Sequence, residues 1–310
     1  MLVRFWGTRG SVPSPITSRD IKAKIVEALL SADGRRFADE AEANAFVDGE
    51  LEFPVGNTYG ANTSCVELDL GEGEFMVFDM GSGLRPFGID AIERFGDGRP
   101  KTFNIFMSHL HWDHILGFPF FNPAFMPGCK LNFFGGHSQI EYALRRQQEK
   151  ISFPVPFDFM KAEMKFTTLT PGETYEIGGC EVGLIKQCHD NDSFGYRVEH
   201  GGKSIVYSTD AEHKSDDVAL ESAFVDFLRD ADLVISDTMY SLGDSIAMKE
   251  DWGHSSGVIA VGLCHRAHAK RLAMFHHEPL YDDKTLHEIY GETVRYEALT
   301  RMESTLEVIC

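Results

Sequence analysis

The sequence predicts a mixed α/β fold in four layers, an αββα sandwich in which two mixed β-sheets pack face to face and helices cover their outer faces. Segments with the apolar pattern of strands come in two runs, and segments with helical spacing flank each run. Polar residues recur where these strands end, as expected when a rigid sheet presents a site. These residues are Asp79, His109, His189, Asp210, Asp237 and His276. We expect one domain over residues 1–310.

The first elements form the N-terminal part of this fold. A predicted strand over residues 2–6 leads into a glycine-rich turn and two prolines, which stop regular structure. Residues 18–55 predict a helical insertion, because apolar residues recur there with helical spacing and an acidic stretch follows. Ser18 or Asp20 could cap its first helix. The insertion is either a surface helical pair without catalytic importance or a lid or dimer contact.

The remaining elements follow from residue 56 onward, and their short connections favour mixed or antiparallel sheets. We expect strands over 64–70, 74–79, 102–109 and 130–136, a helix over 138–148, strands over 181–189, 194–200 and 204–210, a helix end and strand over 226–237, a helix over 255–269, a strand over 271–277, a helix over 283–299 and a last strand over 304–309.

Composition and charge narrow the classes of protein. The formal charge of −19 argues against binding of long nucleic acid, because proteins that bind it carry basic surfaces. A small anionic substrate is still compatible with this charge. No segment approaches the roughly 18 apolar residues of a membrane span, and no secretory signal opens the chain. Six scattered cysteines without a CxxC pair favour reduced thiols and a cytoplasmic location, with Cys188 notable beside His189.

One short segment concentrates residues that bind metals. His109, His111, Asp113 and His114 fall within six positions, directly after an apolar run. Imidazole and carboxylate groups are ligands for zinc and related ions. In extended backbone, residues two apart point the same way, so His109 and His111 can share one ion, and a turn then brings Asp113 and His114 to a second. The alternative is a polar loop with helix-capping roles.

Three more ligands are expected at distant strand ends. His189, Asp210 and either His276 or His277 close predicted strands, and we favour His276 because it directly follows the strand. The completed set places His109, His111 and His189 on one ion, and Asp113, His114 and His276 on the other, with Asp210 between them. The sequence thus predicts two divalent cations; zinc suits these ligands, while manganese and iron use similar shells.

The segment "SHLHWDH" resembles the HxHxDH signature of the metallo-β-lactamase superfamily. The segments "RFWGTRGSVPSP", "YGANTSCVEL", "VFDMGSGLR", "YSTDAEH", "WGHSS" and "FHHEP" are similar, in order, to motifs of its phosphodiesterase and tRNase Z-like branch. The resemblance covers nearly the whole chain outside the insertion. It implies the αββα sandwich, a dinuclear site at the sandwich edge, and hydrolysis by a metal-bound hydroxide. The loop "CHDNDSFGYR" departs from the Pro-Gly common there, which leaves the substrate open.

The resemblance and the residues together suggest roles for three side chains. Asp113 is expected to bind metal and to orient the attacking hydroxide. Asp79 most plausibly accepts a hydrogen bond from a ligand imidazole, with turn capping as the alternative. In the tRNase Z-like branch, a histidine at the place of His254 contacts the phosphate and protonates the leaving alkoxide, which suits phosphodiester cleavage. The alternative for His254 is a structural role, beside Ser255 or Ser256 as a helix cap.

These observations favour a hydrolase that cleaves a cyclic nucleotide or another small phosphodiester. The alternatives are a lactone or thioester hydrolase on the same scaffold and a metal-containing nucleotide-binding protein with little turnover. We expect no long nucleic acid and no membrane as partners, and a homodimer. The aromatic residues beside the site belong to the core by default, although one or two could stack on a base. They are Trp112, Phe118, Phe120 and Phe121.

Overall fold

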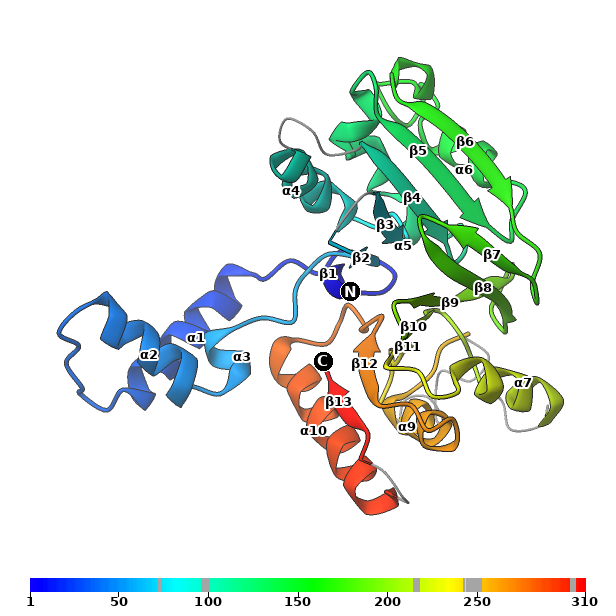
Figure 1. The fold of residues 1–310 in the computed structure, drawn as a ribbon. Coiled ribbons are helices and arrows are strands. Elements are labelled where there is room, and N and C mark those ends of the chain that lie inside the picture. The colour runs from blue at the N-terminus through cyan, green and yellow to red at the C-terminus, as the bar shows by residue number, and fades with distance from the viewer. Residues whose placement is uncertain (72–73, 96–100, 214–217, 242, 244–252, 302–304) are drawn as a thin grey trace.

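Two mixed β-sheets pack against each other in the computed structural model, with helices on their outer faces (Figure 1). The structure describes residues 1–71, 74–95, 101–213, 218–241, 243, 253–301 and 305–310. Trp252 of the "WGHSS" segment and Ser304, the first residue of the predicted last strand, lie outside the described residues. The predicted αββα sandwich of mixed sheets is confirmed.

The first sheet holds strands from the N-terminal half in sequence order. The strands β1, β2 and β3 pair antiparallel, and β3, β4, β5 and β6 pair in parallel. Their bounds are β1 Leu2–Gly7, β2 Cys65–Asp69, β3 Phe75–Phe78, β4 Thr102–Met107, β5 Lys130–Gly135 and β6 Glu163–Thr168. The buried residues of β3 and β4 fit parallel strands that are covered on both faces.

The second sheet is ordered β13-β12-β11-β10-β9-β8-β7. The pairs from β13 to β10 are parallel, and those from β10 to β7 are antiparallel. The bounds are β7 Thr174–Ile177, β8 Cys180–Gln187, β9 Ser193–His200, β10 Lys203–Ser208, β11 Leu233–Asp237, β12 Arg271–Phe275 and β13 Glu307–Ile309. Two antiparallel steps separate β8 from β10, so β8 and β10 run in the same direction.

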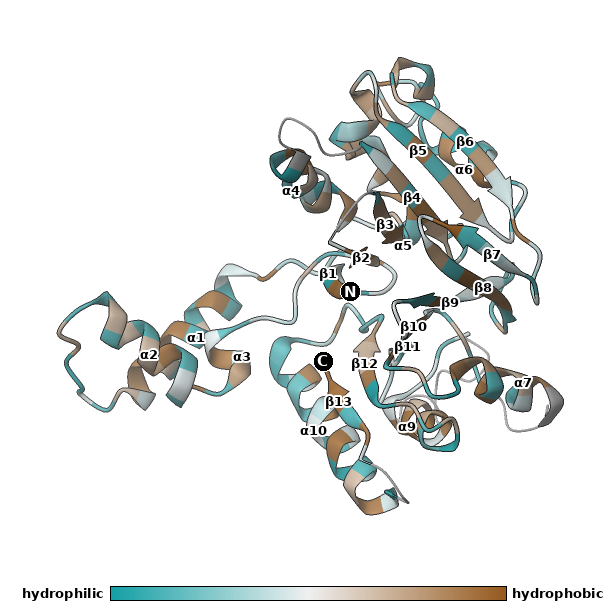
Figure 2. Ribbon diagram, viewed as in Figure 1, coloured by the Kyte–Doolittle hydropathy of each residue, from teal (hydrophilic) through white to brown (hydrophobic). Residues whose placement is uncertain are grey.

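Three apolar clusters hold these layers together. Between the sheets, Phe78 and Phe106 from the first sheet meet Tyr196 and Phe275 from the second, all fully buried. A second cluster lies under α4 (Leu84–Phe95) and α6 (Ile140–Gln147), and a third under α7 (Val218–Leu228), α9 (Gly257–Arg266) and α10 (Asp283–Thr300). Fully buried and more exposed residues alternate along β5, and Figure 2 shows hydrophobic and hydrophilic stretches along its ribbon.

The predicted insertion forms an arm of helices. Its elements are α1 (Ser18–Ser31), α2 (Glu40–Glu50) and α3 (Phe53–Gly56), which project away from both sheets on the side of α10 (Figure 1). Lys24 Nζ lies 2.7 Å from Asp283 Oδ2 at the start of α10, which ties the arm to the body. The cap of α1 is Thr17, and Asp20 is its capping-box partner, so the prediction of Ser18 or Asp20 as the cap was wrong.

Several other details differ from the sequence prediction. The prediction omitted α4, β6 and β7. Ser256 does occupy the N-cap position of α9, but its side chain makes no capping hydrogen bond. The six cysteines are all free, as expected. Among the described residues, none of the helices combines the length and the apolar character that crossing a membrane requires.

Candidate metal centre

The predicted ligands converge where the carboxyl ends of strands from both sheets meet. His109 follows β4 after one residue, Ser108, and the short helix α5 (Trp112–Ile115) carries Asp113 and His114. The second sheet contributes His189 after β8, Asp210 after β10 and His276 after β12. Because β8, β10 and β12 run in the same direction, their carboxyl ends lie at one edge of that sheet.

The first group of donors consists of three imidazoles. One ring nitrogen from each of His109, His111 and His189 lies within 4.8 Å of the others. His189 Nδ1 lies 2.9 Å from the carbonyl oxygen of Gly253, to which it donates, so His189 Nε2 carries a lone pair. That Nε2 atom lies 3.2 Å from His111 Nδ1. His109 Nε2 is buried and has no hydrogen-bond partner among the described residues.

The second group combines two carboxylates with two imidazoles, and all four residues are buried. Asp113 Oδ2 lies 3.2 Å from His114 Nε2 and 3.1 Å from His276 Nε2. The two Nε2 atoms are themselves 3.3 Å apart. The backbone N–H of Ser11 donates to Asp113 Oδ2 across 2.7 Å, so the glycine-rich turn after β1 also positions this carboxylate.

Asp210 lies between the groups and turns one oxygen to each. Its Oδ1 is 3.2 Å from His114 Nε2 and 3.3 Å from His276 Nε2. Its Oδ2 is 3.6 Å from His109 Nε2 and 3.8 Å from His189 Nε2. This geometry suits a carboxylate shared by two cations.

Asp79 orients the His114 ring through a hydrogen bond. His114 Nδ1 donates to Asp79 Oδ2 across 2.8 Å, which leaves Nε2 free to face the second group. Ser108 and Tyr207 donate hydroxyl hydrogen bonds to the same oxygen, at 2.6 and 2.7 Å. The arrangement matches the predicted hydrogen bond from a ligand imidazole. Ser108 and Tyr207 could not be identified from the sequence, where their only signal is a hydroxyl at the end of a buried strand.

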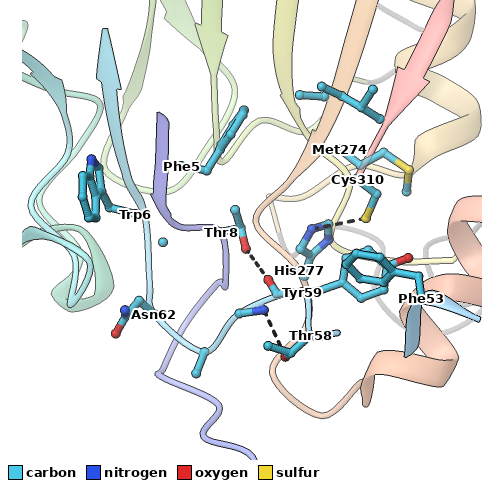
Figure 3. Close-up of a pocket in the computed structure, with 15 residues that line it drawn as sticks. Phe5, Trp6, Thr8, Phe53, Thr58, Tyr59, Asn62, Met274, His277 and Cys310 are labelled. Carbon is cyan, nitrogen blue, oxygen red and sulfur yellow. Dashed lines mark hydrogen bonds between the residues drawn. The ribbon is translucent and has the colours of Figure 1, made fainter. Parts of the chain in front are cut away.

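His276 and His277 point into different places. His276 faces the second group, whereas His277 lines a separate cavity of about 370 Å³ with Phe53, Tyr59 and Cys310 (Figure 3). Cys310 Sγ lies 3.6 Å from His277 Nε2. Burial, with smaller effects from the charges of Arg9 and His276, lowers the pKa of His277 to about 3. The structure therefore brings His276, and not His277, to the cluster.

Three residues of the site adopt a left-handed backbone. The φ angles are +59° at Asp79, +47° at Asp210 and +60° at His276, each within two residues of a strand end. This turn lifts the side chain out of the strand's alternation toward the sheet edge. Gly10 approaches the His276 ring so closely that an added Cβ would lie 2.5 Å from its Nδ1 atom. Glycine is thus required at position 10 for the ring to stay where it is.

The donor set fits divalent cations. The Nε2 atoms of His114 and His276 lie 3.1–3.3 Å from carboxylate oxygens of Asp113 and Asp210, and such a convergence of electron-pair donors is unfavourable unless a positive charge, either a proton or a metal cation, lies among them. Burial lowers the pKa of His114, but the carboxylates of Asp210, Asp113 and Asp79 outweigh it and raise that pKa well above its ordinary value. The negative charge of the pocket therefore attracts a positive one. Nitrogen and oxygen ligands of this kind are those of zinc and its neighbours.

His254 lies beside both groups of donors. Its Nδ1 lies 2.7 Å from Asp237 Oδ2, and its ring stacks on His276 with centroids 5.0 Å apart. One of its ring nitrogens lies within 4.8 Å of ligand atoms of His189 and Asp210. Burial lowers the pKa of His254, but the carboxylates of Asp237, Asp210 and Asp113 outweigh it and raise that pKa to about 9. From the sequence, Asp237 was recognisable only as a polar residue at a strand end, without a predicted role.

The aromatic residues beside the cluster divide into two kinds. Phe118 and Phe121 are fully buried and belong to the core, as the default interpretation had it. Trp112 and Phe120 are 79% and 51% exposed and line a cleft that reaches His111.

Comparisons with known proteins agree with this geometry. A family model described as "Beta-lactamase superfamily domain" matches residues 94–277. The chain is 24% identical to Ribonuclease Z of Picrophilus torridus over 253 residues, which is 62% of this chain and 77% of the relative.

Two solved structures share the fold. One is the metallo-β-lactamase fold protein YhfI of Bacillus subtilis, with a TM-score of 0.61 and 16% identity over 99% of this chain and 95% of that one. The other is a diphosphatase of the PhnP family, with a TM-score of 0.59 and 17% identity over 99% of this chain and 94% of that one. The chain therefore belongs to the β-lactamase superfamily and is a metal-dependent hydrolase.

Proposed function

We propose that the protein is a phosphodiesterase that acts on a cyclic nucleotide or another small phosphodiester. The observation that carries the proposal is the position of His254, which Asp237 holds beside the donor cluster. An alkoxide leaving from phosphorus needs a proton, whereas a thiolate leaving from a thioester does not. A histidine positioned there is therefore more useful for phosphodiester chemistry.

The proposal assigns two divalent cations to the cluster. His109, His111 and His189 hold one, Asp113, His114 and His276 hold the other, and Asp210 contacts both. Zinc is the metal we favour, and manganese and iron remain alternatives with similar ligands. When bound, such a pair lowers the pKa of a shared water molecule and polarises a phosphoryl oxygen.

The chain's own residues then do three things. Asp79 holds the His114 ring in one tautomer and one rotation through the 2.8 Å hydrogen bond to Nδ1. Asp113 receives its described side-chain contacts on Oδ2, so Oδ1 can accept a hydrogen bond from the attacking water and orient it. His254 donates through Nδ1 to Asp237 and presents its Nε2–H to the leaving oxygen.

A second candidate is cleavage of RNA, favoured by the name of the relative Ribonuclease Z. The formal charge of −19 weighs against it, because phosphate contacts by lysine and arginine dominate binding of long nucleic acid. We therefore keep the small phosphodiester as the leading proposal.

One set of assays tests the function. Purified protein supplied with zinc or manganese is incubated with a cyclic nucleotide, bis-p-nitrophenyl phosphate, a structured RNA, a thioester and a lactone. We expect turnover of the small phosphodiesters, and loss of cyclic nucleotide turnover in His254→Ala with metal content unchanged.

Other outcomes decide against the proposal. Thioester or lactone turnover that ignores His254 would assign the alternative hydrolase. Efficient cleavage of RNA without turnover of small phosphodiesters would assign the second candidate. Full metal content with no turnover of any substrate would assign a binding protein.

A further inference from the structure

A deep cleft opens beside the donor cluster and shares His111 with it. Its volume is about 1130 Å³, which is ample for a nucleotide. Residues from α5, α6 and the loop after His189 line it, so the cleft leads directly away from the first group of donors. A substrate whose phosphate lies at the cluster would extend its remaining part into this cleft.

Large aromatic side chains line the cleft and are exposed. Trp112, Phe120 and Tyr142 are 79%, 51% and 63% exposed, and all three line it. Phe153 completes this wall, its ring centroid 5.5 Å from that of Phe120. Single exposed apolar residues need no explanation, but several exposed aromatic side chains that line one cleft beside a candidate reactive centre mark a binding surface.

The polar residues of the cleft suit a heterocycle. Arg146 lines the cleft and has no ion-pair partner among the described residues, whereas its neighbour Arg145 pairs with Glu141 and Asp158. Asp192 is neutralised by Lys186 at 2.7 Å. A guanidinium free of such a pair can donate to acceptor atoms at the edge of a base or stack on its face.

We propose that this cleft binds the nucleobase of the substrate, with the base stacked on Trp112 and its edge directed toward Arg146. The inference rests on the proposed phosphodiesterase function and narrows its substrates to nucleotides. Every base has an aromatic face, so stacking on Trp112 gives affinity, and Arg146 favours bases with acceptor atoms. Trp112 directly follows His111, which fixes the distance between the base and the phosphate.

Equilibrium binding tests the inference without turnover. Zinc-loaded protein is titrated by calorimetry with adenosine 5′-monophosphate and with ribose 5-phosphate, which lacks the base. We expect the nucleotide to bind at least about fivefold more tightly. Trp112→Ala should remove most of that preference and leave ribose 5-phosphate binding within about twofold, while Trp112→Phe, which keeps an aromatic face, should retain it.

Fluorescence provides a second readout with a matched control. The nucleotide should quench tryptophan emission in the parent protein and in Trp6→Phe, whose indole donates to Glu67 outside the cleft, but not in Trp112→Phe. Tyr142→Ala, an exposed change on α6, is the second variant in case Trp112→Ala fails to fold. It should weaken binding of the nucleotide and leave binding of ribose 5-phosphate unchanged.

Two results would overturn the inference. One is equal affinity for the two ligands. The other is a Trp112→Ala variant that loses both equally or changes only the oligomeric state. If phosphodiesters are hydrolysed but the base gives no preference, the base site is wrong and the proposed function stands. If the base preference holds but no phosphodiester is hydrolysed, the base site stands and the proposed function is wrong.

Discussion

His254 donates a hydrogen bond from Nδ1 to Asp237 Oδ2 across 2.7 Å, and this contact joins the segment before α9 to the end of β11. The carboxylate fixes the ring beside the ligand atoms of His189 and Asp210. A histidine held in this way can place a proton at one point in space, which a freely rotating side chain cannot do.

The proton donation proposed for His254 should matter in proportion to the basicity of the leaving group. His254→Ala should slow hydrolysis of a cyclic nucleotide by about 10²- to 10⁴-fold. The same change should affect bis-p-nitrophenyl phosphate far less, because p-nitrophenolate leaves without protonation. Steady-state kinetics on both substrates measures the difference, and Asp237→Asn should show the same pattern more weakly. Equal losses on both substrates would refute the role as proton donor.

Asp79 should control metal affinity without touching the metal. Asp79→Asn removes the charge that orients His114, and zinc affinity should fall by about 10- to 100-fold. Competition with a chromophoric chelator measures it. The control is Asp69→Asn on β2, whose carboxylate pairs with Arg4 away from the cluster. Unchanged zinc affinity in Asp79→Asn would return Asp79 to a turn-capping role.

Gly10 should be needed for the second group of donors. In Gly10→Ala the new Cβ would overlap the His276 ring, so we expect zinc binding to that group to weaken by at least about tenfold. Metal analysis after dialysis should show the loss of one equivalent of zinc. Gly49→Ala is the matched control, since nothing lies near its Cβ position in α2. A parent-like stoichiometry in Gly10→Ala would show that His276 can move without consequence.

Glu297 should stabilise the C-terminal part of the fold in a pH-dependent way. Its carboxylate accepts hydrogen bonds from the Arg301 side chain and from the backbone N–H of Leu306. These hydrogen bonds lower the pKa of Glu297 to about 2, and the one from Arg301 has the largest effect. The unfolded chain binds the proton first as pH falls, so this stabilisation is full above about pH 4.5 and is lost toward pH 2.

Glu297→Gln should therefore cost about 1–2 kcal/mol of unfolding free energy at neutral pH. The difference from the parent should shrink toward about pH 3. Urea unfolding at several pH values checks it, with Glu288→Gln, an exposed change on α10, as the control. A difference that stays constant with pH would contradict the assigned ionisation.

The residues of the cluster could be predicted because their positions depend on local residue spacing and on the topology of the sheets. The spacing of His109 and His111 follows from extended backbone, and strand ends of a layered fold gather at one edge. The choice between His276 and His277 was harder, because both follow a buried strand. The left-handed backbone at His276 breaks the alternation on which such a choice depends.

Other features depend on packing that a sequence does not display. Pro86 and Gly88 interrupt the helical pattern of α4, yet Leu84, Phe87 and Ala91 are fully buried and hold it in place. The pairing of Asp237 with His254 depends on how the segment before α9 returns to the sheet edge. The cleft lined by Trp112 is likewise assembled from segments that are distant in the chain.

The left-handed backbone at Asp79, Asp210 and His276 limits how this edge of the sandwich can be re-engineered. Glycine, asparagine and aspartate enter that conformation most readily, while most other side chains cost about 1–3 kcal/mol there. A glutamate or cysteine substituted at these positions could bind a metal ion, but its backbone would be strained in the left-handed conformation. Attempts to convert the site to another metal should therefore begin at His109, His111 or His189, whose φ angles are ordinary.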